Sequence, residues 1–127
     1  MRLPVLFAAA SAETTISTDS LLYLGEAGDP VPDRALLQQI RVDLRWDKGG
    51  TAPLTWVLTA DEAGDQPLWS GEDDATDALT DGDRASVQLA LGEDGIARAG
   101  TGGRLYLWLS LAAGNAYATA TLTGEQR

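Results

Sequence analysis

Alternation of apolar and polar residues is the feature that most constrains how this chain can fold. In residues 39–47 the alternate positions form two sets, here called the two parities of the segment. One parity is apolar and the other is charged: Ile40, Val42, Leu44 and Trp46 alternate with Arg41, Asp43 and Arg45. Successive side chains of an extended strand point to opposite faces of a sheet. This segment is therefore predicted to be a strand with one buried face and one solvated face.

Other short segments show the same period. The inward parity of residues 54–60 and 85–91 is predicted to hold Leu54, Trp56, Leu58, Val87, Leu89 and Leu91. Residues 66–70 return after the turn sequence DEAGD, which predicts a hairpin with residues 54–60. Residues 3–9 and 13–24 are also expected to be extended.

Glycine and aspartate separate these runs at regular intervals, which is typical of all-β domains. Residues 33–39 (DRALLQQ) are the one helical candidate, with Asp33 as the N-cap. We therefore predict an all-β fold: an antiparallel β-sandwich or jelly-roll-like barrel of about eight short strands, with at most one short helix.

The segment 102–125 (GGRLYLWLSLAAGNAYATATLTGE) is unusual because its first strand has no polar side. Leu105, Leu107, Leu109 and Leu111 fill one parity, and Tyr106 and Trp108 stand on the other. We expect AAGNA to join two strands as a closing hairpin, so that Tyr117 on the return strand shares a face with the other two aromatics. A neighbouring subunit could cover that face.

The length of 127 residues suits one domain. We divide the chain into an N-terminal apolar arm or edge strand, residues 1–12, and a single β domain, residues 13–127. The start of the chain resembles a short secretory signal that ends in Ala-Ser-Ala. It is shorter than the usual ~15–30 residues, so a strand or arm is the preferred interpretation. No apolar stretch approaches the ~20 residues of a membrane span.

Composition excludes several classes of function. The chain has no cysteine and no histidine, so thiolate and imidazole catalysis and the corresponding metal sites are absent. Lys and Arg number 9 against 19 Asp and Glu, a net charge of -10 that disfavours nucleic acid and anionic membranes as partners. We expect no catalytic residue, no cofactor and no bound metal.

Acidic residues dominate the stretch 61–94, where Arg84 is the one basic residue. A carboxylate pair of the glycosidase type needs an apolar cleft that nothing in the sequence indicates. Calcium is the other possibility, with oxygen ligands from Asp73, Asp74, Asp77, Asp81 and Asp83. Their spacing does not match an EF-hand, so solvated loops are the preferred interpretation.

The candidate site residues are apolar and aromatic. We expect Trp46 and Trp56 to pack in the core because they lie on inward parities. The residues assigned to an interface are Leu3, Val5, Phe7, Tyr106, Trp108 and Tyr117. Apolar arms of this kind can add a strand to a neighbouring molecule. An exposed aromatic row could instead bind sugar rings, as in a secreted carbohydrate-binding β-sandwich.

The short apolar N-terminal run, the Ala/Gly/Asp/Thr-rich strands and the absence of Cys and His resemble small β-rich virion proteins of tailed bacteriophages. The chain is most similar to the capsid decoration (cement) type. This resemblance implies a non-enzymatic structural protein, often trimeric, that binds a major capsid protein and stabilises the shell. It also implies a location in the virion, which is assembled in the host cytoplasm. A tail, head-completion or fibre protein and a calcium-dependent adhesion module remain alternatives.

Overall fold

The computed structural model describes residues 5–18, 20–32, 34–48, 54–65, 67–73, 84–89, 96–97, 104–111 and 114–126. The described strands are β1 (Val5–Ala10), β2 (Thr14–Ile16), β3 (Ser20–Leu24), β4 (Ala27–Gly28), β5 (Ala35–Lys48), β6 (Leu54–Thr59), β7 (Pro67–Asp73), β8 (Arg84–Leu89), β9 (Ile96–Ala97), β10 (Leu105–Leu111) and β11 (Asn115–Gln126). No helix occurs among the described residues.

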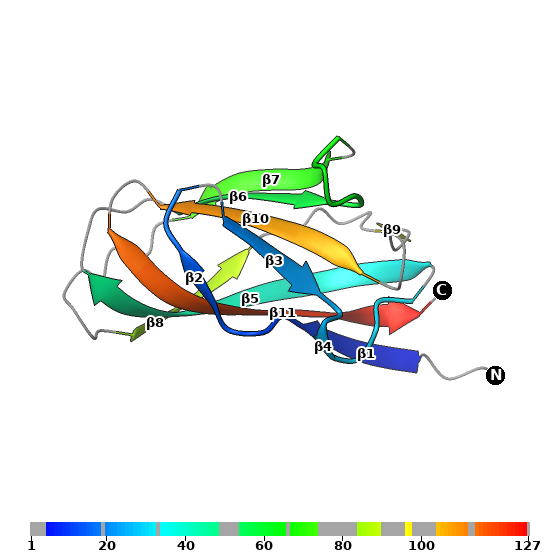
Figure 1. Cartoon of the computed structure of the whole chain (residues 1–127). Coiled ribbons are helices and arrows are strands. Elements are labelled where there is room, and N and C mark those ends of the chain that lie inside the picture. Colours follow the sequence, from blue (N-terminus) through cyan, green and yellow to red (C-terminus); the bar gives the residue numbers. More distant parts are fainter. Residues whose placement is uncertain are drawn as a thin grey trace.

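The strands form two antiparallel sheets that pack face to face (Figure 1). The larger sheet has the order β4-β1-β11-β5-β8, with β2 also on β11 and β9 also on β5. The smaller sheet has the order β3-β10-β6-β7. The predicted all-β sandwich is therefore confirmed.

The strand pairs are nested along the chain. β6 pairs with β7, β5 with β8, β3 with β10, and β1 and β2 with β11. Successive pairs alternate between the smaller and the larger sheet. A long hairpin wound in this way is the arrangement of a jelly roll. The fold thus matches the jelly-roll-like form of the prediction.

The inward parities pack as predicted into one core between the sheets. Ile40, Val42, Leu44 and Trp46 of β5 are buried, as are Leu54, Trp56 and Leu58 of β6 and Val87 and Leu89 of β8. The four leucines of β10 belong to the same core. Leu91 lies outside the described residues.

The predicted closing hairpin is wrong. β10 lies in the smaller sheet, with both of its edges occupied by β3 and β6. β11 lies in the larger sheet, where it pairs with β1, β2 and β5. The two strands are adjacent in sequence but belong to different sheets. Alternation identifies a strand and its buried face, but it does not identify the strand's partner.

The predicted helix over residues 33–39 is also wrong, because residues 35–39 begin β5. Ala35 and Leu37 are buried on one parity, and Ile40 continues the buried face on the other. The change of parity occurs at a register shift where β11 passes from Thr123 to Gly124. An extra residue in a strand shifts the period in this way. Because of this shift, the buried residues Leu37 and Ile40 stand three positions apart, a spacing that also fits one face of a helix. Asp33 lies outside the described residues.

Gly124 allows the backbones to approach at this irregularity. A Cβ at Gly124 would overlap the backbone oxygen of Leu36 and stand 3.0 Å from Cε1 of Phe7. Glycine within a strand often marks such a close approach. The contact joins the β5 irregularity to the packing of β1 against β11.

We predict that Gly124→Ala lowers the free energy of unfolding by about 1–3 kcal/mol, the usual cost of overpacking. Urea denaturation followed by tryptophan fluorescence measures it. Thr121→Ala, a partly exposed position on the same strand, is the control and should change stability by less than about 0.5 kcal/mol. Equal effects from the two variants would contradict the proposed close approach.

Candidate functional site

Val5–Ala10 of the segment that the sequence assigns to an arm or edge strand form β1 in the larger sheet. β1 pairs with β11 along its whole length, from Val5 opposite Gln126 to Ala10 opposite Thr121. On its other side, β1 pairs with β4 only at Ala9 and Ala10. Most of the outer edge of β1 therefore has no neighbouring strand among the described residues.

Hydrogen bonds cover part of this outer edge. The backbone N–H of Asp29 donates to the carbonyl oxygen of Ala8 at 2.9 Å, and the N–H of Ala8 donates to Oδ2 of Asp29 at 3.1 Å. The N–H of Gly25 donates to the carbonyl oxygen of Ala10 at 3.1 Å. The backbone groups of Ala8 and Ala10 therefore point away from β11. By the alternation of antiparallel pairing, those of Leu6 point away too.

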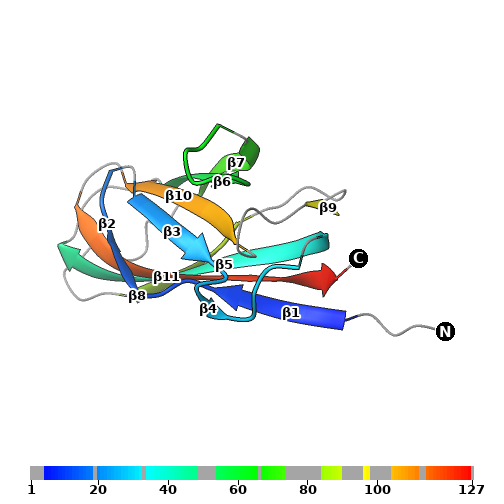
Figure 2. The same ribbon diagram turned by 45° about the vertical axis from the view of Figure 1, so that its right-hand side comes forward.

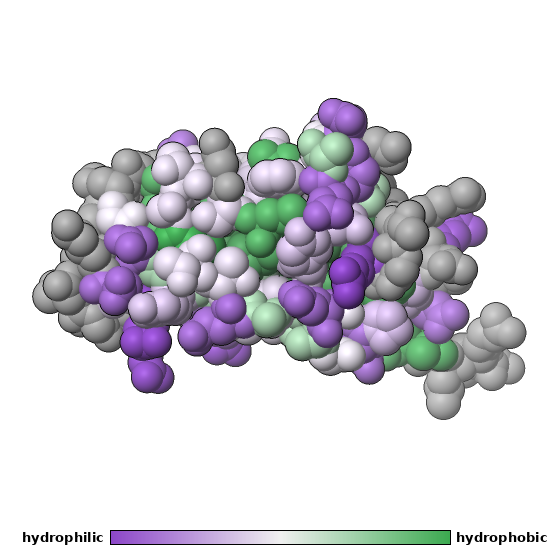
Figure 3. Space-filling view, viewed as in Figure 1, coloured by the Kyte–Doolittle hydropathy of each residue, from purple (hydrophilic) through white to green (hydrophobic). Residues whose placement is uncertain are grey.

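The edge is open at Leu6. Val5 is 57% exposed and Leu6 is 68% exposed, and they are the exposed large hydrophobic residues of the described chain. Figure 3 shows hydrophobic atoms at the start of β1. Of the predicted interface residues, Val5 lies at this open edge, and Leu3 lies outside the described residues.

A shallow hollow of about 330 Å³ adjoins this edge on the outer face of the sheet. Its lining comes from β1, β5, β11 and the loop that covers Ala8, and consists of Leu6, Phe7, Ala8, Asp29, Gln38, Thr123 and Gly124. Phe7 itself is only 7% exposed and packs in the core. The prediction that Phe7 forms part of a surface is therefore corrected, because its parity is that of the inward-facing Ala9.

The aromatic parity of β10 faces outward from the smaller sheet, but the chain itself covers it. Tyr106 is 7% exposed and meets Tyr23 of β3 edge to face, with ring centroids 5.7 Å apart. The indole Nε1 of Trp108 donates to Oγ1 of Thr59 at 3.3 Å. A Cβ on Gly64 would stand 3.6 Å from the Trp108 indole, so this turn lies against the ring.

The covering element is the turn between β6 and β7, on the side of the smaller sheet away from the larger one (Figure 2). The Tyr23 hydroxyl donates to Oε1 of Glu62 at 2.8 Å, which attaches the turn to β3. Within the turn, Oγ1 of Thr59 donates to the carbonyl oxygen of Asp61 at 2.7 Å, and the N–H of Asp65 donates to Oδ2 of Asp61 at 2.9 Å. The turn thus covers a face that the sequence leaves without a neighbour.

A hollow of about 400 Å³ remains beside Trp108, lined by Val57, Thr59, Ala63, Gly64 and Trp108. Trp108 is half-buried, so it presents only part of its ring there.

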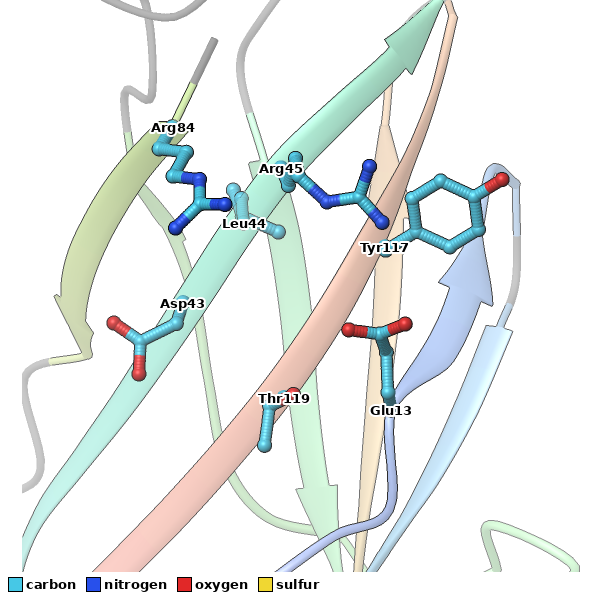
Figure 4. A pocket seen from close by; sticks show the side chains of 7 residues that line it. All are labelled: Glu13, Asp43, Leu44, Arg45, Arg84, Tyr117 and Thr119. Carbon is cyan, nitrogen blue, oxygen red and sulfur yellow. The ribbon is translucent and has the colours of Figure 1, made fainter. Parts of the chain in front are cut away.

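Tyr117 lies on the outer face of the other sheet. The guanidinium of Arg45 stands over its ring, 4.5 Å from the ring centroid (Figure 4). The predicted common face of Tyr106, Trp108 and Tyr117 is therefore wrong, because β10 and β11 belong to different sheets. Sequence reasoning also missed Tyr23 and Gly64, whose roles depend on which strand and turn adjoin β10.

The acidic residues give no metal site within the described part of the chain, where no cluster of three or more potential ligands occurs. Four of the five aspartates considered as calcium ligands, Asp74, Asp77, Asp81 and Asp83, lie outside the described residues. Asp73 ends β7, and its side chain is also outside the description. The described chain contains no helix long and apolar enough to span a membrane.

Comparisons with known proteins show no family. No family model and no curated protein matches the chain. One similar solved structure is described as "Bacillus endospore appendages form a novel family of disulfide-linked pili". The identity is 12%, the similarity covers 99% of this chain and 93% of that chain, and the TM-score is 0.40. A similarity of this size supports no statement about function.

The Tyr23–Glu62 contact predicts a change of stability in alkali. The hydrogen bond to Glu62, together with desolvation and the nearby negative charge, raises the pKa of Tyr23 above 10.0. The unfolded chain loses this proton near pH ~10, whereas the folded chain holds it to higher pH. The stabilisation is therefore complete below pH ~10 and is lost as the pH rises through the higher folded pKa.

We expect Tyr23→Phe to remove this contribution, so that the melting temperature of the variant falls less steeply than that of the wild type above pH ~10. Thermal melts at a series of alkaline pH values measure it. Tyr117→Phe removes a tyrosine hydroxyl from the opposite sheet and serves as the control. If the two variants have the same slope, the hydrogen bond to Glu62 does not couple Tyr23 to folding.

Proposed function

We propose that this chain is a non-enzymatic structural protein that associates through the open edge of β1, with copies of itself and with a larger assembly. The observation that carries the proposal is the exposure of Val5 and Leu6 at that edge, 57% and 68%. Single exposed apolar residues are ordinary on protein surfaces. Here, however, they lie where the backbone N–H and C=O groups of Leu6 point outward and form no hydrogen bond with a described residue.

An open strand edge is a template for pairing with another chain. An added strand would gain main-chain hydrogen bonds at Leu6, and its side chains would rest on the adjoining hollow of about 330 Å³. The contacts of Asp29 with Ala8 limit the addition to the start of β1. The added strand would therefore pair with only the first residues of β1, and the pairing would stop before Ala8.

The proposed partners are copies of this chain, with a trimer favoured, and a major capsid or other virion protein. Pairing of two β1 edges with each other would give a two-fold dimer, whereas pairing of β1 with a different surface can close a ring of three. Within this proposal the specific role is capsid decoration on a bacteriophage virion, as the sequence resemblance implies. Jelly-roll domains are common in viral capsids, which is consistent with it. The net charge of -10 disfavours nucleic acid as a partner.

Other virion roles, such as a tail, head-completion or fibre protein, would use the same edge. The carbohydrate-binding alternative is less supported, because it needs an exposed aromatic row. In the described structure Tyr106 is buried and Trp108 lies under the β6–β7 turn.

We predict that Leu6→Lys reduces self-association by placing a charge at the open edge. Size-exclusion chromatography with light scattering, over a range of protein concentrations, measures the mass of the wild type and the variant. The wild type should be oligomeric. The dissociation constant of the variant oligomer should be at least about tenfold higher than that of the wild type, the ratio expected for a loss of about 1.4 kcal/mol of association free energy.

The matched control is Gln88→Lys, which adds the same charge to an exposed position on β8, at the opposite edge of the same sheet. It should associate like the wild type. A wild type that is monomeric at every concentration would contradict the proposal, as would two variants that behave alike.

The virion role has a separate test. If capsid genes adjoin the gene for this chain, empty shells of that capsid protein can be sedimented with the purified chain. Co-sedimentation of the wild type, with loss for Leu6→Lys, is expected. Its absence would leave self-association in place but would contradict capsid decoration.

A further inference from the structure

Two arginines and a tyrosine form a row across the outer face of the larger sheet. Arg84 of β8 lies opposite Arg45 of β5, and Arg45 lies opposite Tyr117 of β11. Both arginines are exposed, and Tyr117 is half-buried. Three strands therefore bring two positive charges to one place on a chain whose net charge is -10.

Like charges directly opposite each other across a ladder are destabilising. A third arginine on this face shows how the sheet neutralises such a charge. Nε of Arg41 donates to Oδ1 of Asp43 and to Oγ of Ser86, at 3.0 Å each, and the Ser86 hydroxyl also donates to Oδ1 of Asp43. Arg41–Asp43 is an ion pair within the described part of the chain, with Nε and Oδ1 3.0 Å apart. Arg45 and Arg84 have no carboxylate partner there.

Arg45, Arg84 and Tyr117 line a hollow of about 190 Å³. Figure 4 shows Arg84, Arg45, Tyr117 and Glu13 arranged around an open space, with Asp43 and Thr119 completing the ring. Asp43 is already engaged by Arg41 and Ser86. The charges left are two guanidinium groups and the Glu13 carboxylate, which sum to one positive charge.

We infer that this hollow binds one small oxyanion-bearing molecule, with the anionic group held between Arg45 and Arg84. A single negative charge would neutralise the site and would relieve the repulsion between the two arginines. Arginine binds carboxylate and phosphate oxygens through paired N–H donors. The cation–π contact with Tyr117 positions the Arg45 guanidinium beside that ring, which also lines the hollow (Figure 4).

The rest of the lining selects the class of molecule. The Glu13 carboxylate is a hydrogen-bond acceptor, and the Thr119 hydroxyl can donate or accept. These groups suit the hydroxyls of a polyhydroxylated acid. The hollow, of about 190 Å³, lies on the face of the sheet and offers these groups together to one ligand unit. The class assigned is therefore a hydroxylated carboxylic acid such as an acidic monosaccharide.

The test uses the full chain and titrates it with sodium glucuronate, followed by the chemical shifts of the backbone amides. We expect saturable shifts centred on Arg45, Arg84 and Tyr117, and none with glucose, which lacks the carboxylate. Arg84→Gln should weaken binding by about tenfold or more, as expected for loss of a charge-assisted hydrogen bond. Higher salt should weaken it further.

The matched control is Arg34→Gln, which removes the same charge from an exposed position just before β5 that does not line the hollow. Its affinity should stay within about twofold of the wild type. Equal weakening by Arg34→Gln and Arg84→Gln would overturn the site, because binding would then reflect only the general charge of the chain. No saturable shift with glucuronate, or equal shifts with glucose, would also overturn it.

Inorganic phosphate is the second probe. Saturable shifts of the same amides with phosphate, absent in Arg84→Gln, would support the oxyanion site. They would also show that the anionic group alone accounts for the affinity. Binding of glucuronate without phosphate supports selection of the hydroxylated acid. None of these outcomes depends on the β1 edge, so the oxyanion site and the proposed assembly can fail separately.

Discussion

The fold depends on the long antiparallel ladder between β5 and β11, which runs from Asn115 opposite Lys48 to Gln126 opposite Ala35. The free side of β11 accepts β1 and β2, and the free side of β5 accepts β8 and β9. All other strands of the larger sheet except β4 are therefore placed by these two. The same ladder brings Arg45 next to Tyr117 on the outer face.

The two sheets contribute side chains of different size to one core. β10 supplies four leucines, whereas the inward parity of β11 supplies Ala116, Ala118, Ala120 and Leu122, all buried. Large residues from one layer packed with small residues from the other allow two sheets to interdigitate without voids. This division accommodates the four leucines of β10 in the core, whereas Tyr23 and the β6–β7 turn cover the aromatics on its outward parity.

The outer faces of the two sheets differ. The aromatic side chains of the smaller sheet are covered by the chain itself, whereas the larger sheet leaves some of its side chains exposed. The aromatics of β10 are held by Tyr23 and by the β6–β7 turn, with Glu62 attaching that turn to β3. The larger sheet instead carries Arg41, Arg45 and Arg84, and its edge strand exposes Val5 and Leu6. Both proposed sites, the β1 edge and the oxyanion hollow, therefore lie on the larger sheet.

The sequence by itself determined the all-β class, most strand positions and the buried parities of β5, β6, β8 and β10, because alternation reports directly which side chains leave water. Only the tertiary structure decided which strands are neighbours. Alternation carries no information about partners, so the pairing of β10 with β3, the separation of Tyr117 from Tyr106 and the opposition of Arg45 and Arg84 were not predictable. The irregularity near Gln38 hid the start of β5, because one extra residue changes the period that the prediction relies on.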